Sequence, residues 1–360
     1  MSGSSKSDRR GEWLFVGVPR VRATGGSLRA GHLPATLIER TDGAVLSTFG
    51  RRGLPSLAVA IARRSGLWRE PVHVATSRLW LGVALRFLRG PVVGRLLDLH
   101  DHPGMQSDAF GIPLTREQRA RLDRQVDANI AAFELLAVQS TSFAELCRLP
   151  ADRILIAPNG TDTAAIRPGP DPVDGVVAMI SGGAPGRGIE LLIDAVERLR
   201  ADEPGVTLRL GLAATGPASR DYIAGLRAHV AARPWISARS VPYSQLTAFL
   251  AQARTLVIPH PPHPYYDAVL PVKLFDGMAA GRPTVVTPRH ETARLLRERD
   301  AGVVAEGDTP DELAQAIGDL LRDQERQARL GANARRAAVE EFDWRLISER
   351  LASAVLDRIG

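Results

Sequence analysis

The chain has 360 residues, enough for two domains of ordinary size, and its hydrophobic content of 44% and charged content of 24% are those of a globular protein. No apolar run reaches membrane-spanning length, the polar N-terminus carries no export signal, and a single cysteine, Cys147, excludes an internal disulfide, so a cytoplasmic protein is expected. The net charge of +6 raises nucleic acid as a partner, but acidic and basic residues alternate along the expected helices and aromatic residues make up only 5% of the chain, which argues against it.

The first half of the chain alternates short apolar runs with helix-like segments. Residues 13–18 are expected to form a strand, followed by a loop with Gly25 and Gly26 and by a helix over 28–40. Paired glycines let backbone N–H groups approach a phosphate or a sugar, although a plain turn explains them as well. Further strands are expected at 43–48, 72–75, 91–99, 135–140 and 153–157, and helices at 54–64, 77–88, 116–133 and 141–149.

The segment 77–89 has two interpretations. It is apolar and carries three arginines, which suits a helix lying on an anionic membrane surface. A buried crossover helix between two strands fits the same pattern, and both interpretations stay open.

His100 stands at the end of the apolar run 91–99 and is followed by Asp101 and His102. Parallel sheets bind their ligands at the carboxyl ends of strands, so we expect His100 to face a cleft, where it and the aspartate would form an acid–base pair. The alternative is a loop histidine bonded to backbone. His-x-His spacing without a further His or Cys cluster is weak support for a metal, and no metal site is predicted.

The second half restarts the alternation after 168–175, a segment rich in proline and glycine that is the best candidate for an inter-domain linker. A strand at 176–180 leads through a glycine-rich turn to a helix at 189–200, and Arg187 just before that helix is a candidate for binding phosphate. Further strands are expected at 207–212, 236–241, 255–259, 284–287 and 302–305, and helices at 220–232, 244–252, 291–299, 310–322, 323–341 and 343–359. The repeated alternation predicts two doubly wound parallel sheets facing a cleft.

The stretch 270–287 is expected to form a loop, a short helix and a buried strand. Lys273 lies in the first turn of that helix, where free N–H groups attract an anion and a lysine is unfavourable without one. Lys6 and Lys273 are the only lysines among 46 basic residues, which favours Lys273 as a point charge for a site over a lysine of the ordinary surface. Asp276, one turn further on, offers a carboxylate suited to a diol.

Together these segments resemble the retaining glycosyltransferases of the GT-B fold, in the large family 4 group. The resemblance covers nearly the whole chain, most strongly from Leu155 onward. The matching pieces, in chain order, are Gly25 with Gly26, His100, Ser140, 157–162, 187–195, 241–246, 271–283 and 342–344.

The resemblance implies an α/β protein with two Rossmann-like domains facing a cleft. These would be an acceptor domain at 1–168, whose residues 1–11 form a flexible tail, and a nucleotide-sugar donor domain at 169–340. The C-terminal helix, 341–360, would return toward the N-terminal domain.

The implied reaction moves a sugar from a nucleotide-diphosphate sugar, UDP or GDP, to an acceptor with retention of the anomeric configuration. The acceptor would be a small molecule, a lipid-linked molecule or a polysaccharide, in glycoconjugate or secondary-metabolite biosynthesis. No metal and no further cofactor is expected. Peripheral contact with the inner face of a membrane would fit a lipid-linked acceptor.

The resemblance also implies roles for single positions. His100 would position the transferred sugar, while Lys273, Arg187 and the N–H groups of residues 269–272 would stabilise the leaving diphosphate. Tyr243 would border the base and Asp276 would bind the ribose. The complete donor-binding set is Gly25, Gly26, Gly183, Tyr243, Asp267, Val269, Leu270 and Asp276, and the acceptor-binding set is Asp101, His102 and Asn159.

Three departures from the family keep alternatives open. The family's first glutamate is replaced by Ala268, its second by Asp276, and a usual arginine by Gly182. An inverting enzyme with His100 and Asp101 as the base pair, a nucleotide-sugar epimerase and a catalytically inactive partner protein therefore remain alternatives. A nicotinamide-dependent dehydrogenase is disfavoured because the G-x-G-x-x-G spacing is absent.

Overall fold

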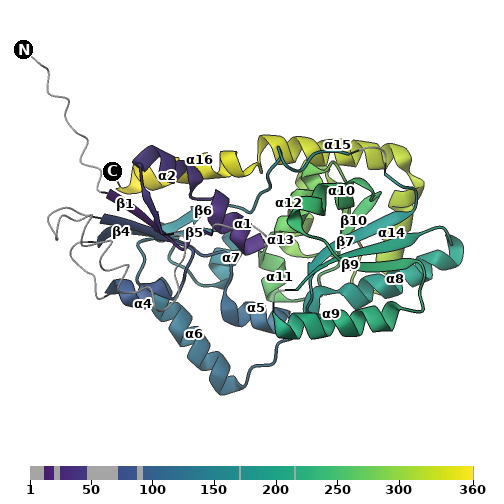
Figure 1. The fold of residues 1–360 in the computed structure, drawn as a ribbon, viewed down its shortest axis with the longest axis horizontal. Coiled ribbons are helices and arrows are strands. Elements are labelled where there is room, and N and C mark those ends of the chain that lie inside the picture. Colours follow the sequence, from purple (N-terminus) through teal and green to yellow (C-terminus); the bar gives the residue numbers. More distant parts are fainter. Residues whose placement is uncertain are drawn as a thin grey trace, which may run out of the picture.

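The computed structural model describes residues 12–19, 25–46, 72–86, 92–169, 172–214 and 216–359. They form two α/β units side by side along the long axis of the molecule, each with a parallel six-stranded sheet and flanking helices (Figure 1). The expected helix at 54–64 and the expected tail at 1–11 lie outside the described residues. Among the residues that are described, no helix is long and apolar enough to cross a membrane.

The N-terminal sheet has the strand order β2-β1-β3-β4-β5-β6. Its strands are β1 (Glu12–Val16), β2 (Ala44–Leu46), β3 (Val72–Thr76), β4 (Val92–Asp98), β5 (Leu135–Val138) and β6 (Ile154–Ile156). Every residue of β3 and β5 is buried, as expected of strands covered on both faces of a parallel sheet. His100 lies two residues after the carboxyl end of β4.

The helices of this domain differ from the expectation in two places. They are α1 (Gly25–His32), α2 (Ala35–Thr41), α4 (Leu81–Arg86), α5 (Pro103–Ala109), α6 (Arg116–Ile130) and α7 (Thr141–Leu146). The single helix expected over 28–40 is wrong: the chain forms α1 and α2, because Pro34 has no N–H to continue the hydrogen-bond ladder and instead precedes the first residue of α2. The sequence patterns also miss α5, whose first turn holds Pro103 and whose N-cap is His102.

The segment 77–88 packs into the domain as far as it is described. Leu81 and Leu85 of α4 are fully buried in the N-terminal core, and α4 contacts α6. These two side chains therefore support the crossover-helix interpretation and are not available to a membrane surface.

The C-terminal sheet has the order β12-β11-β10-β7-β8-β9. Its strands are β7 (Val176–Gly182), β8 (Thr207–Ala213), β9 (Ile236–Ser240), β10 (Thr255–Ile258), β11 (Thr284–Val286) and β12 (Gly302–Val304), and its helices are α8 (Ile189–Asp202), α9 (Pro217–Val230), α10 (Leu246–Ala251), α11 (Pro264–Ala268), α12 (Val272–Ala279), α13 (His290–Arg299), α14 (Pro310–Arg322) and α15 (Gln324–Glu340). Because β7 pairs with both β8 and β10, the strand order reverses at β7. Open α/β sheets hold their ligands in the crevice at such a switch point.

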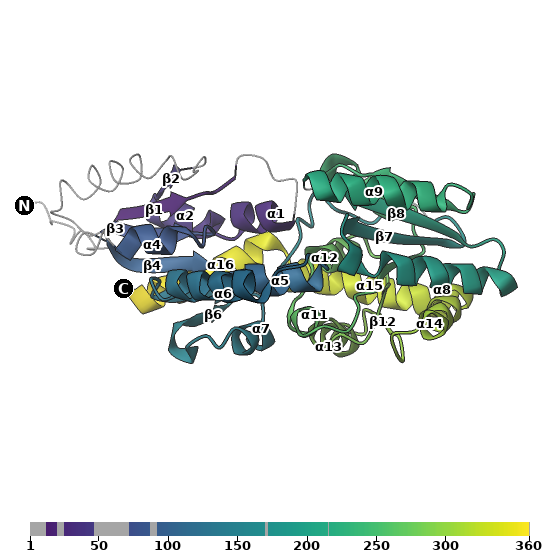
Figure 2. The same cartoon turned by 90° about the horizontal axis from the view of Figure 1, so that it is seen from below.

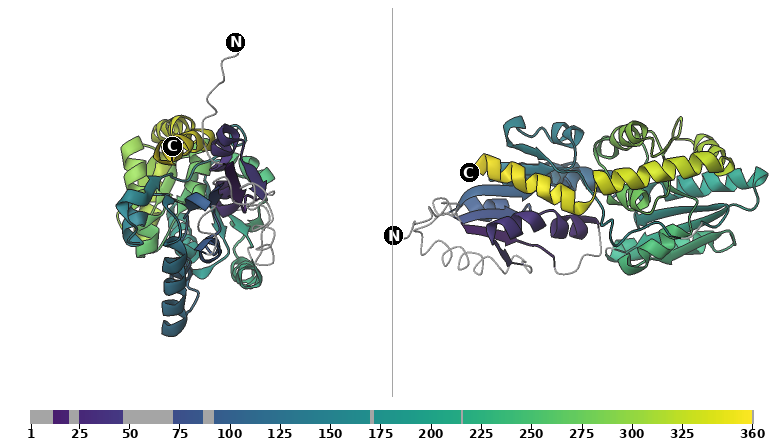
Figure 3. Two further views of the ribbon diagram at one scale, coloured as in Figure 1. Left: turned by 90° about the vertical axis from the view of Figure 1, so that its left-hand side faces the viewer. Right: turned by 90° about the horizontal axis from the view of Figure 1, so that it is seen from above.

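The last helix returns to the N-terminal domain. After α15, which lies on the C-terminal domain, α16 (Trp344–Ile359) runs along the N-terminal one (Figure 2, Figure 3). Ile347 and Leu351 of α16 are buried in one cluster with Trp13 and Leu37. The two doubly wound domains and the returning helix confirm the expected GT-B architecture.

Helix α11 joins the two domains in the middle of the molecule. The chain enters it from β10 of the C-terminal sheet, yet Tyr265, Tyr266 and Ala268 are buried in the core cluster of the N-terminal domain. The segment between β10 and α12 thus contains a short helix. His263 caps it, since its Nδ1 accepts a hydrogen bond from the Tyr265 N–H at 3.0 Å.

Candidate functional site

A cleft of about 520 Å³ lies between the carboxyl ends of the two sheets, within the range of small-molecule sites. The end of β4, the turn after β7, the end of β10 and the first turns of α12 all reach it. Its lining includes Leu28, Arg29, His100, Asp101, Gln106, Phe110, Gln139, Asn159, Gly183, Arg187, Tyr243, His260, Tyr265, Tyr266, Val269, Leu270, Lys273 and Asp276.

Lys273 lies in the first turn of α12 and is half-buried in the wall of this cleft. Burial, and second the charge of Arg187, lower the pKa of the Lys273 ammonium well below its usual range. No acidic residue in the described part of the chain acts on Lys273 to offset this. Two cationic side chains and a helix N-terminus therefore face the cleft together, an arrangement that an anionic ligand would stabilise.

Arg187 is fixed from the N-terminal domain. Its guanidinium carbon lies 3.7 Å from the centre of the Phe110 ring, a cation–π contact, and its Nε is buried without a hydrogen-bond partner among the described residues. The turn before it packs tightly as well: a Cβ on Gly186 would lie 2.0 Å from the Ala109 carbonyl oxygen. The N-terminal domain thus helps to orient the cation of the C-terminal one.

Asp276 lies one turn after Lys273 and is 5% exposed. Its Oδ1 accepts a hydrogen bond from the Thr161 hydroxyl at 2.9 Å. Burial raises the pKa of Asp276 to about 7, although the Thr161 hydrogen bond lowers it. Tyr243, whose hydroxyl is buried without a partner in the described part of the chain, lines the same end of the cleft, and burial followed by the Asp276 charge raises its pKa.

His100 lies between two carboxylates on the N-terminal wall. Its Nδ1 is 3.9 Å from Asp98 Oδ2 and its Nε2 is 3.5 Å from Asp101 Oδ2. Asp98 in turn accepts from Arg29 Nε at 2.7 Å, and Asp101 accepts from the Tyr265 hydroxyl. This chain of contacts orients the imidazole, and through Tyr265 it reaches α11.

Most of the site residues predicted from the sequence line this one cleft. Ten of the fourteen do so: His100, Asp101, Asn159, Gly183, Arg187, Tyr243, Val269, Leu270, Lys273 and Asp276. Asn159 is also used structurally, because its Nδ2 donates to the Leu270 carbonyl at 2.7 Å and so ties β6 to the start of α12.

The other four predicted residues are Gly25, Gly26, His102 and Asp267. Gly25 and Gly26 are the first two residues of α1, and their contact with a phosphate stays a prediction. His102 is turned into the N-terminal domain, where its Nδ1 caps α5 and where burial lowers its pKa. Asp267 accepts from the His290 N–H at 3.2 Å, at the start of α13.

One of the backbone donors expected over 269–272 already has a partner. The Leu270 N–H donates to Gln139 Oε1 at 2.8 Å, and Pro271 has no N–H. A side chain from the end of β5 thus reaches across the domain boundary to this segment, and the role of its other N–H groups toward a diphosphate stays a prediction.

The cleft contains residues that the sequence analysis does not single out, namely Phe110, Gln139, His260, Tyr265 and Tyr266. His260 could have been found by the rule that selected His100, because it also lies two residues after the end of an apolar strand. The others reach the cleft through packing between distant segments, for which no local pattern exists.

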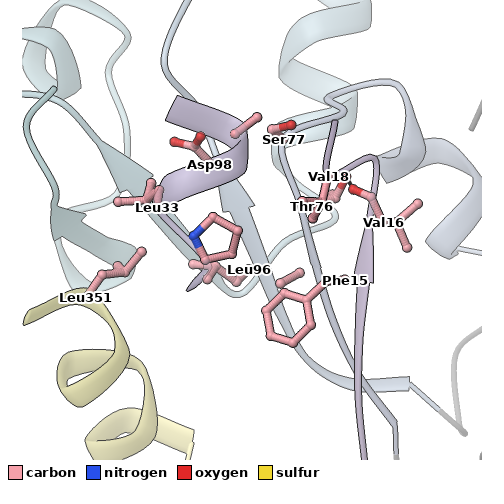
Figure 4. A pocket seen from close by; sticks show the side chains of 12 residues that line it. Phe15, Val16, Val18, Leu33, Thr76, Ser77, Leu96, Asp98 and Leu351 are labelled. Atoms are coloured by element: carbon pink, nitrogen blue, oxygen red, sulfur yellow. Dashed lines mark hydrogen bonds between the residues drawn. The ribbon is translucent and has the colours of Figure 1, made fainter. Parts of the chain in front are cut away.

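A second, much smaller pocket lies inside the N-terminal domain, between the sheet and helices α1, α2 and α16 (Figure 4). Apolar side chains such as Phe15, Leu33 and Leu351 line it, and Asp98 lies at one end. Its volume of about 30 Å³ is far below the roughly 300 Å³ of the smallest usual ligand pockets. It is a packing gap behind the wall that carries His100 and not a substrate site.

Comparison with known proteins shows which proteins this fold and cleft resemble. Residues 175–323 match the family described as glycosyl transferases group 1. Solved structures with the same fold include sucrose-phosphate synthase from Thermosynechococcus elongatus, with a TM-score of 0.73 and 16% identity over 97% of this chain and 99% of that one. Anabaena HepE in complex with UDP and glucose has a TM-score of 0.71 and 17% identity over 96% of this chain and 100% of that one.

Two curated relatives are mannosyltransferases. The chain is 30% identical to the MMP alpha-(1->4)-mannosyltransferase of Mycolicibacterium hassiacum over 249 residues. These residues cover 64% of this chain and 54% of the relative. The chain is 26% identical over 304 residues to the GDP-mannose-dependent alpha-(1-6)-phosphatidylinositol monomannoside mannosyltransferase of Mycolicibacterium smegmatis, 78% of this chain and 76% of that one. The chain thus spans about half the length of the first of these relatives. The resemblance to group 1 glycosyltransferases of the GT-B fold is confirmed.

Proposed function

We propose that the chain is a glycosyltransferase that moves a sugar from a nucleotide-diphosphate sugar to an acceptor. The observation that carries this proposal is that Lys273 and Arg187 lie in the same cleft, both without a carboxylate partner among the described residues, beside the carboxylate of Asp276. A diphosphate would neutralise the two cations, and the hydroxyls of the ribose diol would donate hydrogen bonds to the Asp276 carboxylate. The mannosyltransferase relatives and the UDP complex of HepE support the same class of ligand.

The chemistry of sugar transfer explains why cations are needed there. Breaking the bond between the anomeric carbon and the phosphate oxygen leaves the electron pair, and hence negative charge, on the diphosphate. Lys273, Arg187 and the N-terminal turn of α12 would stabilise this charge as it develops, within a partly water-excluded cleft. His100, oriented by Asp98 and Asp101, would hold the sugar hydroxyls on the opposite wall.

A thermal-unfolding screen tests the donor class. UDP, GDP, TDP, ADP and NAD are compared at about a hundred times the expected dissociation constant, where binding adds roughly 2.7 kcal/mol to the free energy of unfolding. One nucleoside diphosphate should raise the melting temperature, and its sugar derivative should then be consumed when acceptors are added. A shift with NAD alone would overturn the proposal. Isomerised sugar without acceptor would indicate an epimerase, and binding without any turnover an inactive partner protein.

We further propose that transfer retains the anomeric configuration. In a retaining reaction the departing phosphate itself accepts the proton of the acceptor hydroxyl, so no strong protein base is required. His100, held between Asp98 and Asp101, would then contact the sugar hydroxyls without having to remove a proton. Proton NMR of the first product should show the same anomeric coupling as the donor. The opposite anomer would overturn retention and assign His100 with Asp101 as the base, while the transferase proposal would stand.

The acceptor wall is polar. His100, Asp101, Gln106 and Gln139 line it from the N-terminal domain, and Phe110 adds an apolar edge. Hydroxyl-rich acceptors fit these side chains, so we propose that the acceptor is a polyol or a sugar, either free or carried by a lipid or polysaccharide.

A further inference from the structure

We propose that His260 is a further donor-site residue whose ring N–H binds an oxygen of the nucleotide diphosphate. This inference rests on the proposed function and adds to it a side chain that neither the sequence patterns nor the comparisons assign. His260 lies two residues after the end of β10 and lines the cleft.

The ring of His260 is buried, and within the described ranges of the chain no group forms a hydrogen bond with it. The residue is 1% exposed, and both Nδ1 and Nε2 are buried without a partner among the described residues. Every neutral imidazole carries one N–H donor and one acceptor nitrogen. Buried polar atoms in folded proteins are nearly always bonded, so an unbonded ring that lines a cleft indicates a missing ligand.

The ring cannot turn away to satisfy itself. It stacks on Tyr266, with ring centres 4.1 Å apart and planes inclined by 20°. Tyr266 is itself fixed, because its hydroxyl donates to the Gly186 carbonyl at 2.6 Å and lies 3.1 Å from the Ala109 carbonyl. His260 is therefore held in one orientation before any ligand binds.

Burial, together with the positive charge around it, keeps the ring neutral. Burial first, and then the positive charges of Lys273, Arg187 and Arg289, lower the pKa of His260 well below its usual range. Arg289 is neutralised by Asp308, whose two oxygens both lie 2.6 Å from its Nη2. Lys273 and Arg187 remain as the charges that a ligand would balance, and the neutral ring would add an N–H donor to an oxygen of that same anion.

The position of the ring favours the diphosphate over the sugar or the acceptor. β10 lies beside β7, whose last residues begin the turn that carries Arg187. The end of β10 touches that turn: a Cβ on Gly188 would lie 1.8 Å from the Pro259 carbonyl oxygen. His260 thus stands next to the phosphate-binding turn of the C-terminal domain, opposite the wall that carries His100.

The test compares His260→Phe with His260→Gln and with the exposed-surface control His229→Phe. Phenylalanine keeps the aromatic stack on Tyr266 and removes the N–H, whereas glutamine keeps an N–H donor and removes the stack. The probes are the nucleoside diphosphate that binds the wild-type protein and the matching nucleoside, measured by calorimetry. We expect His260→Phe to weaken diphosphate binding by at least about tenfold, as for loss of a hydrogen bond to a charged group. Nucleoside binding should stay within about twofold, and His260→Gln should recover most of the loss.

The outcomes separate this inference from the proposed function. If the wild-type protein binds no nucleoside diphosphate, the proposed function fails. If it does and His260→Phe binds equally well, or His260→Gln loses as much as His260→Phe, the role of the N–H is overturned while the proposed function stands. Should the phenylalanine variant fail to fold, ¹⁵N NMR of histidine-labelled wild-type protein decides: a ring N–H protected from exchange must appear when the diphosphate is added, and its absence refutes the contact.

Discussion

Replacement of Lys273 by methionine is expected to lower kcat/KM for sugar transfer by at least about tenfold. Methionine fills a similar volume in the first turn of α12 but leaves Arg187 as the remaining side-chain cation for the leaving diphosphate. A hydrogen bond to a charged group contributes about 1.5–3 kcal/mol, and about 1.4 kcal/mol corresponds to a tenfold change in rate. Steady-state kinetics with the donor identified in the screen measure the effect.

The same replacement should make the ligand-free protein more stable. The pKa of Lys273 in the fold is well below its value in the unfolded chain, because of burial and then Arg187. Between these two pKa values the unfolded state holds a proton that the folded state has released, so the free energy of unfolding rises with pH across that interval. Below it, the charged lysine opposes folding, and there Lys273→Met should show its largest gain in urea unfolding.

A matched control removes one positive charge from the same domain but away from the cleft. Arg297 on α13 is exposed, and Arg297→Met should change neither turnover nor stability measurably. If Lys273→Met turns over like the wild-type protein, the leaving group does not depend on this charge, and the observation that carries the proposed function is lost. A sharply lower melting temperature of the ligand-free Lys273→Met variant would mean that Lys273 has a structural role.

Replacement of Arg29 by methionine should destabilise the protein by about 3–5 kcal/mol, the usual cost of removing one partner of a buried ion pair. Arg29 is 1% exposed. Its Nε donates to Asp98 at 2.7 Å, and its Nη1 donates to the Ala157 carbonyl at 2.8 Å and lies 3.2 Å from Asn159 Oδ1. Without it, Asp98 would stay half-buried and unpaired beside His100, so activity should fall in the molecules that still fold.

Two variants control this prediction, with unfolding in urea followed by circular dichroism. Arg40→Met, in the next helix, removes one exposed hydrogen bond to Ser353 and should change stability by no more than about 0.5 kcal/mol. Arg29→Lys keeps the charge but not the forked geometry, and should remain clearly destabilised. Equal stability of Arg29→Met and Arg40→Met would show that the buried pair does not hold the wall that carries His100.

Much of the fold can be predicted from this sequence because its elements follow local rules. Apolar runs of strand length alternate with segments of helical periodicity, and this alternation predicts the strands of both six-stranded sheets. Capped helix boundaries are predicted as well: α14 begins right after Thr309, at the residue expected from the sequence. The errors are local too. Pro34 divides a segment whose apolar periodicity predicts one continuous helix. Helices α5 and α11 are too short to show a periodic pattern, and they are capped by histidines, which are not among the usual N-cap residues.

The candidate site divides in the same way. Lys273, Asp276 and His100 can be selected from the sequence, because a helix start and a strand end are local features with known chemistry. The orientation of the His102 side chain cannot be predicted in this way, since it depends on how α5 packs on α6. The bond between the Leu270 N–H and Gln139 likewise joins residues far apart in the chain.

By itself the sequence determines that this protein has two doubly wound domains, and it predicts an anion site at the start of α12, because periodicity, capping and charge act within one or two turns of the chain. Only the tertiary structure decides which groups meet there. Arg187 lies on Phe110, Asp98 pairs with Arg29, and the His260 ring faces the cleft with no hydrogen-bond partner in the described part of the chain. The reason is physical. Each of these contacts depends on how segments far apart in the sequence pack together and exclude water, and no periodicity along the chain encodes which segments meet.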